Sequence, residues 1–93
     1  MLVGIVKVKI YISFAQSLKE KRAIVKSICS KVRNKFNVSI AEVEDQDIHK
    51  NIVIGISLVS NNKRIIDSQI DKILNYIETL VPGDIINVER EII

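Results

Sequence analysis

The fold is decided by the stretch VSIAEVEDQDIHKNIVIGISLV, residues 38–59. Both ends of this stretch are rich in β-branched residues, which predicts one strand over residues 38–44 and another over residues 52–59. The polar run Asp45-Gln46-Asp47 predicts a turn between them. Because a turn of this length is too short for a parallel crossover, we expect the two strands to be antiparallel.

A predicted helix joins each of these strands to one further strand. Upstream, residues 2–12 alternate between apolar and polar side chains, as half-buried strands do. Ser17-Leu18-Lys19-Glu20 then has the form of a capping box, which predicts a helix over about residues 17–35. Downstream, a helix is expected between Ser60-Asn61-Asn62 and Pro82-Gly83, followed by a strand over residues 86–92.

The resulting order is strand, helix, strand, strand, helix, strand. This order predicts an α+β fold of the ferredoxin-like βαββαβ type, in which a four-stranded antiparallel sheet has two helices on one face. With 93 residues the chain is long enough for one domain, so residues 1–93 are expected to form a single ferredoxin-like domain.

The composition is that of a protein with a folded core. Hydrophobic residues make up 47% and charged residues 27%, and the charges interrupt every apolar run well before the roughly 18–20 residues that a membrane span requires. The first residues lack a basic leader, so a signal peptide is not expected. Cys29 is the only cysteine, which excludes an internal disulfide and fits a cytoplasmic location.

The charge is concentrated on the first helix. Residues 17–37 contain seven basic side chains and one acid, a local charge of +6, whereas the whole chain has +3 and the other residues therefore sum to −3. At 100° per residue, one flank of this helix carries four bases, called the basic ridge below: Lys19, Arg22, Lys26 and Arg33.

The handedness of the crossover predicts that the basic ridge lies over the edge strand formed by residues 38–44. The candidate nucleic-acid-binding residues are the ridge together with Lys21, which follows Lys19 in the first helical turn. Two other interpretations remain open: the ridge is an ordinary solvated surface, or it is neutralised by nearby acids. The acids considered for this are Glu42, Glu44 and Asp45 beside the edge strand. Pairing with Asp67, Asp71 and Glu78 of the second helix is disfavoured, because the same handedness turns the two charged flanks toward opposite edges of the sheet.

The face of the sheet without helices is a second candidate surface. The strand phases place apolar side chains on it that predict self-association as a homodimer: Val3, Ile5, Tyr11, Val53 and Val59. The same phases put Ile85, Asn87, Glu89 and Glu91 of the last strand on this face. RNA-recognition domains of this architecture stack bases on aromatic residues of the central strands, and the strand over residues 52–59 has none, which disfavours that mode.

Little in the sequence indicates catalysis. Acidic residues and one histidine cluster at Glu42, Glu44, Asp45, Asp47 and His49, so a metal-dependent enzyme is a weak alternative. No His or Cys pair has the spacing of metal ligands, and no metal site, cofactor or small-molecule substrate is assigned. Cys29 falls on the apolar stripe of the first helix and is expected to be an inert core thiol.

Four sequence motifs resemble the YlxP-like family, a group of small bacterial domains of unknown function. They are Ser17-Leu18-Lys19-Glu20-Lys21-Arg22, the stretch from Phe36 to Val43, Gln46-Asp47, and Val88-Glu89-Arg90-Glu91. The resemblance implies a ferredoxin-like fold. It also implies a ribosome-associated role, because family members are often encoded beside translation and ribosome-maturation factors. Family members tend to carry an aromatic residue soon after the Gln-Asp pair, where this chain has Ile48-His49-Lys50.

Together these features predict a non-catalytic binding module whose basic first helix contacts RNA or the ribosome. The alternative is a protein-interaction module that dimerises through its sheet face or edge. No membrane partner is indicated.

Overall fold

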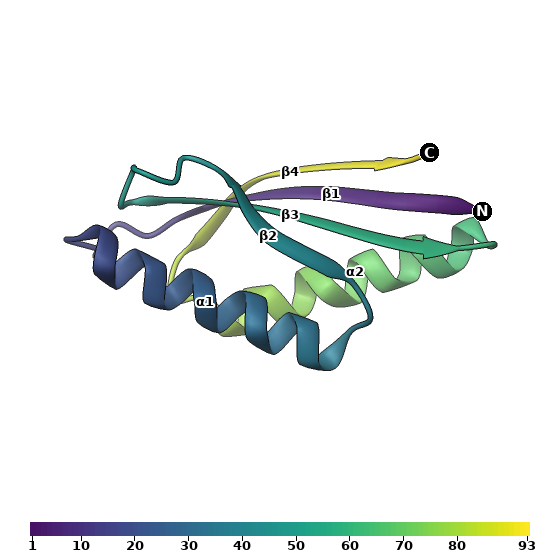
Figure 1. Cartoon of the computed structure of the whole chain (residues 1–93), viewed down its shortest axis with the longest axis horizontal. Helices are drawn as coiled ribbons and strands as arrows, with labels where there is room; N and C mark the ends of the chain where they lie inside the picture. The colour runs from purple at the N-terminus through teal and green to yellow at the C-terminus, as the bar shows by residue number, and fades with distance from the viewer.

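The structure is a computed structural model that describes residues 1–93, and its elements follow the expected order (Figure 1). They are β1 (Leu2–Tyr11), α1 (Leu18–Lys35), β2 (Ser39–Glu44), β3 (Asn51–Ser60), α2 (Lys63–Leu80) and β4 (Asp84–Ile92). The sheet has the order β2-β3-β1-β4 with every neighbouring pair antiparallel. The predicted ferredoxin-like fold is therefore confirmed.

Both helices lie against one face of the sheet, and the core fills the space between the two layers (Figure 1). Alternate residues of β1 and β3 point into it, as their period of two requires, and the apolar stripes of α1 and α2 face them. Fully buried examples are Val8 and Ile54 from the sheet and Val32 and Ile70 from the helices. Neither helix combines the length and the apolar character that crossing a membrane requires.

The helix starts are capped by side chains. The hydroxyl of Ser17 accepts a hydrogen bond from the Glu20 backbone N–H at 3.1 Å, as the capping box predicts. Glu20 reaches back one residue further than expected, because its carboxylate accepts from the Gln16 N–H at 3.2 Å. In α2, the Asn62 side-chain oxygen accepts from the Arg64 N–H at 2.9 Å.

A bulge in β4 corrects the predicted phase of that strand. Lys9 pairs with Asn87 but Ile10 pairs with Ile85, so Ile86 is an extra residue between the two pairs. Ile85 therefore shares the helix-covered face with Ile10 and packs against the core, although its expected place was the open face. Ile86 is 53% exposed instead of buried.

A second bulge lies in β2 between Glu42 and Glu44. The inserted residue, Val43, leans over Gly55 of β3, where a Cβ atom would come within 2.8 Å of a Val43 methyl carbon. Asp45, directly after β2, has a left-handed backbone with φ of 55°. The bulge and this turn redirect the chain after β2, and they set the partners of the acidic residues there.

Candidate nucleic-acid interface

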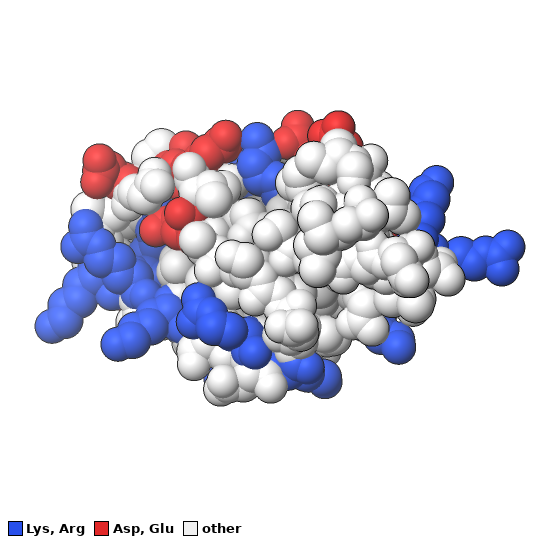
Figure 2. Space-filling model, turned by 45° about the vertical axis from the view of Figure 1, so that its right-hand side comes forward, with Lys and Arg blue, Asp and Glu red and all other residues white.

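The basic ridge lies along the outer side of α1, the helix that packs beside β2. All four ridge side chains are exposed, while Val25, Ile28 and Val32 on the adjacent side of the helix anchor it in the core. In the view of Figure 2, many of the Lys and Arg side chains lie along the helix side, and the acids that are visible lie along the sheet side. The expected exposure of Lys19, Arg22, Lys26 and Arg33 is confirmed.

No ridge residue forms an ion pair with an acid. The ion pairs of the molecule involve four other bases: Lys7 and Lys9 of β1, Lys21 at the buried side of α1, and Arg90 of β4, which holds two carboxylates.

Five of the six acids considered as partners of the ridge are engaged elsewhere, and the sixth, Glu78, forms no ion pair. Glu42 pairs with Lys21 at 2.9 Å, Glu44 with Lys7 at 3.2 Å and Asp45 with Lys9 at 3.8 Å. On the second helix, Arg90 of β4 binds Asp71 at 2.8 Å and Asp67 at 3.3 Å. Neither the acids beside β2 nor those on α2 therefore provide a carboxylate partner for the ridge cations.

Lys21 corrects one sequence-based assignment, because its side chain is fully buried and cannot serve as a surface contact for phosphate. Lys21 occupies the position four residues before Val25, on the buried stripe of α1. Its ammonium donates to the backbone carbonyls of Asp45 and, at 2.9 Å, Ile48, and pairs with the Glu42 carboxylate. That carboxylate oxygen has no other hydrogen-bond partner. Lys21 thus fastens the β2–β3 turn to the start of α1.

Arg33 has a second contact besides its exposure to solvent. One guanidinium nitrogen donates to the Ile40 carbonyl of β2 at 3.2 Å. This bond ties the last turns of α1 to the edge strand of the sheet. Because a guanidinium has five N–H donors, Arg33 retains donors for an outside acceptor.

The Glu42 to His49 stretch does not assemble a metal site. Glu42 points under α1 toward Lys21, whereas Glu44 and Asp45 bind lysines on the opposite, open face of the sheet. The left-handed Asp45 also accepts a hydrogen bond from the Asn51 side chain at 3.4 Å. No three acidic, histidine or cysteine side chains converge anywhere in the chain.

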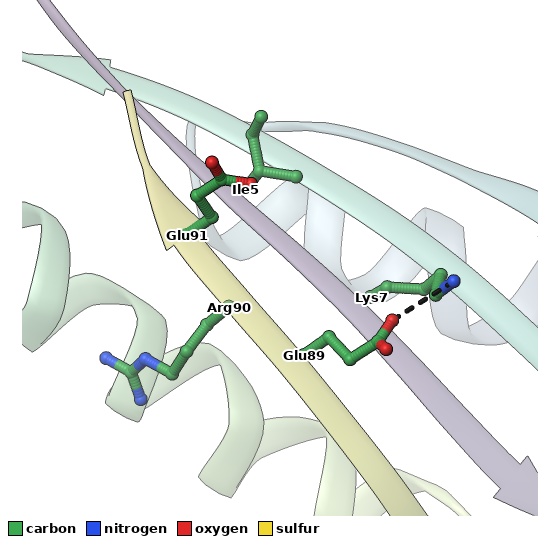
Figure 3. A pocket seen from close by; sticks show the side chains of 5 residues that line it. All are labelled: Ile5, Lys7, Glu89, Arg90 and Glu91. Atoms are coloured by element: carbon green, nitrogen blue, oxygen red, sulfur yellow. Dashed lines mark ion pairs between the residues drawn. The ribbon is translucent and has the colours of Figure 1, made fainter.

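The open face of the sheet carries lysines that are paired. Lys7 lies between Glu89 at 3.1 Å and Glu44 at 3.2 Å, and its hydrogen bonds to Glu89 and then Glu44 raise the pKa of its ammonium above the ordinary value. In Figure 3, an ion pair joins Lys7 of β1 to Glu89 of β4, and Ile5 and Glu91 lie next to it on the same two strands. Arg90 of β4 points to the other side of the sheet. The depression that these five residues line is therefore a shallow stretch of sheet surface whose side chains diverge.

Of the apolar residues expected on this face, Val53 is covered. Because β3 lies between β1 and β2, the Lys7–Glu44 and Lys9–Asp45 pairs both cross over it, and Val53 is only 1% exposed. This burial removes Val53 from the candidate self-association surface. The others remain accessible: Val3 is half-buried, and Ile5, Tyr11 and Val59 are exposed.

A groove that the sequence did not predict lies between the end of α1 and the second half of α2. Its volume is about 520 Å³, and its lining is Lys35, Phe36, Lys72, Asn75, Tyr76 and Thr79. The Phe36 and Tyr76 rings pack edge to face with centroids 5.9 Å apart. The only signal in the sequence was the helical position of Tyr76, which does not say what lies opposite.

Cys29 is buried beneath α1, as expected for a core thiol. Burial raises the pKa of its sulfhydryl, and nearby Arg33 opposes this effect only in part. A thiol held in its neutral form is a poor nucleophile.

Comparisons with known proteins bear on the family and the fold. Residues 3–90 match the family DUF503, described as a protein of unknown function. The chain is 37% identical over 78 residues to the uncharacterized protein YlxP of Bacillus subtilis (strain 168), covering 84% of this chain and 85% of that protein.

Two solved structures share the fold at low identity. The de novo designed protein LFR1 1 with ferredoxin fold has a TM-score of 0.65 and 19% identity, covering 99% of this chain and 85% of that one. The designed protein Foldit4 has a TM-score of 0.55 and 19% identity, covering 98% and 96%. At this identity, the designed proteins bear on the architecture alone.

Proposed function

The chain belongs to the DUF503 family of proteins of unknown function, and we propose that it is a non-catalytic RNA-binding module whose basic ridge contacts phosphates. The observation that carries the proposal is the state of the ridge cations: they are exposed on one side of one helix, and no carboxylate neutralises them. Lys21 is excluded from the binding set by its burial.

The arrangement favours a polyanion over a small anion. Lys19, Arg22 and Lys26 lie within two turns of α1, and Arg33 extends the row by two more, so the row spans roughly 20 Å at 1.5 Å per residue. Successive phosphates along a nucleic-acid strand can contact such a row in turn. Contacts of this kind hold the backbone and carry no sequence information, so we expect weak sequence preference.

The test is an RNA titration of the wild-type protein and a Lys19→Glu/Arg22→Glu/Lys26→Glu variant at 50 and 200 mM salt. Four phosphate contacts, one for each ridge base, predict a slope of about −3 to −4 for the wild-type protein in a plot of log affinity against log salt. The variant should lose nearly all of this affinity while keeping its circular dichroism spectrum. Ribosomal subunits, titrated in parallel, test whether the RNA is ribosomal.

A charge-matched control separates the ridge from net charge. Lys50→Glu/Lys63→Glu/Arg64→Glu makes the same change in formal charge at three exposed positions outside α1. Retained binding by this control, with loss in the ridge variant, supports the proposal. Equal losses in both variants, or no RNA binding by the wild type, would contradict it.

The alternative function is self-assembly through the open face of the sheet. It is favoured by a row of apolar side chains at one end of that face, where Val3 pairs with Val59 on one side and with Ile93 on the other. Val59 and Ile93 are about 60% exposed, at 62% and 60%. This alternative predicts a mass that rises with concentration and falls back to the monomer in a Val59→Lys variant, measured by sedimentation.

A further inference from the structure

The groove between α1 and α2 has the chemistry of a site for a nucleobase. Its floor is formed by the half-buried rings of Phe36 and Tyr76, and its rim by Lys35, Lys72, Asn75 and Thr79. Stacking on aromatic side chains is the usual way in which proteins hold an unpaired base. The space between these side chains has a volume of about 520 Å³ and opens broadly to solvent.

The charges around the groove suit a nucleotide. Lys35 and Lys72 are exposed, and neither pairs with an acid. The acids of the neighbouring α2 flank, Asp67 and Asp71, are turned to β4 and bound by Arg90. A phosphate at the rim therefore meets two cations, and no carboxylate lines the groove.

The face of the Tyr76 ring already binds one partner, the ammonium of Lys35. This ammonium lies 4.2 Å from the centroid of the Tyr76 ring, a cation–π contact made by an exposed and flexible side chain. A base stacking on Tyr76 takes the place of this ammonium, which can then move to a phosphate. The exchange keeps the ring covered and gives Lys35 a stronger partner.

The groove and the basic ridge belong to the same helix. The ridge follows the β2 flank of α1, and Lys35 stands on its other flank, at the end nearest Tyr76. We infer that the groove receives one unpaired base of the RNA whose phosphates the ridge holds, so that the preferred ligand is single-stranded. This inference rests on the proposed function and adds the class of RNA to it.

The experiment compares a single-stranded oligonucleotide with a duplex of the same length. Tyr76→Leu keeps an apolar side chain but removes the aromatic face, and we expect about a tenfold loss in affinity for the single strand and no change for the duplex. Tyr76→Phe should retain the affinity, because it keeps the ring. Tyr11→Leu, a matched change on the open sheet face, should leave both affinities unaltered.

Two further measurements do not depend on the folding of the leucine variant. The variant Lys35→Gln/Lys72→Gln changes only exposed side chains. It should lower the affinity for the single strand more than the affinity for the duplex. In a Tyr11→Phe protein, Tyr76 is the only tyrosine and the chain has no tryptophan, so its fluorescence should be quenched when a single strand binds.

The outcomes separate this inference from the proposed function. Two results together would overturn the assignment of a base to the groove: Tyr76 fluorescence that is not quenched, and a Tyr76→Leu protein that binds single-stranded RNA as tightly as the wild type. If the ridge variant still fails to bind RNA, the proposed function of the ridge stands. A wild-type protein that binds neither single-stranded nor duplex RNA would overturn both.

Discussion

The outer surface of α1 and the open face of the sheet both carry lysines, yet the two regions differ in what surrounds those lysines. On the sheet, Lys7 lies between Glu44 and Glu89, and Lys9 reaches Asp45. On α1, the exposed bases of the ridge have no acid within ion-pair distance. The number of bases on a surface is therefore a weak guide to binding, whereas the absence of acidic partners is a specific one.

Lys21 provides the sharpest contrast, because it belongs to the basic helix but is paired and buried. In a Lys21→Met variant the Glu42 carboxylate loses its ion-pair partner. The Glu42 side chain is only 17% exposed, so water replaces that partner poorly. We expect Lys21→Met to lower the free energy of unfolding by about 3–5 kcal/mol, measured by urea denaturation.

The controls for Lys21 come from its partner and from its neighbour. Lys21→Met/Glu42→Leu replaces both charges with apolar groups and should recover a large part of the lost stability. Lys26→Met, at an exposed ridge position, should stay within about 0.5 kcal/mol of the wild type. A Lys21→Met protein as stable as the Lys26→Met protein would show that the buried contacts contribute little.

A second variant gives the ridge bases acidic partners like those of the sheet lysines. Ala23→Glu/Ser30→Glu puts a carboxylate four residues after Lys19 and another four residues after Lys26, at exposed positions of α1. All cations remain, and the helix should gain at most a few tenths of a kcal/mol from the new pairs. We nevertheless expect RNA affinity at 50 mM salt to fall about tenfold, because two phosphate contacts now compete with carboxylates.

The same two charges placed away from α1 make the control. Asn61→Glu and Asn87→Glu are exposed positions before α2 and on β4, and together they change the net charge equally. An equal fall in affinity for both double variants would mean that overall charge, and not the pairing of the ridge, governs binding.

The sequence was sufficient for the order and type of all elements, because the patterns of period 2 and period 3.6 are strong in this chain. The exposed flank of α1 also followed from the helical period alone. Lys21 shares the helical period of the buried residues Val25 and Ile28, and its assignment to the binding surface overlooked this signal. The partner that compensates the burial of the Lys21 ammonium is distant in the sequence, because it is the carbonyl of Asp45, 24 residues away in the β2–β3 turn.

The remaining misses have the same physical origin. The bulge that turns Ile85 inward depends on the register of β4 against β1, and the cover over Val53 depends on ion pairs that cross β3. The groove requires Phe36 and Tyr76, 40 residues apart in the sequence, to lie side by side. Local patterns specify faces, whereas partners across faces are set by the packing of the whole chain.

The smallest expected effect concerns the titration of Lys7 on the sheet. Hydrogen bonds to Glu89 and Glu44 raise the pKa of its ammonium above the ordinary value of 10.5, so these contacts stabilise the folded state below that pH. Their contribution is lost as the pH rises through the higher pKa of the folded protein.

NMR titration of the lysine side chains should show the pKa of Lys7 falling in Glu89→Gln and, by a smaller amount, in Glu44→Gln, because the bond to Glu89 is the largest cause of the shift. Glu91→Gln, on the same strand and face but without a contact to Lys7, is the matched control. A Lys7 pKa that stays unchanged in all three variants would mean that the sheet lysine is as free in solution as those of the ridge. The contrast between the two surfaces would then no longer support assigning the binding function to α1.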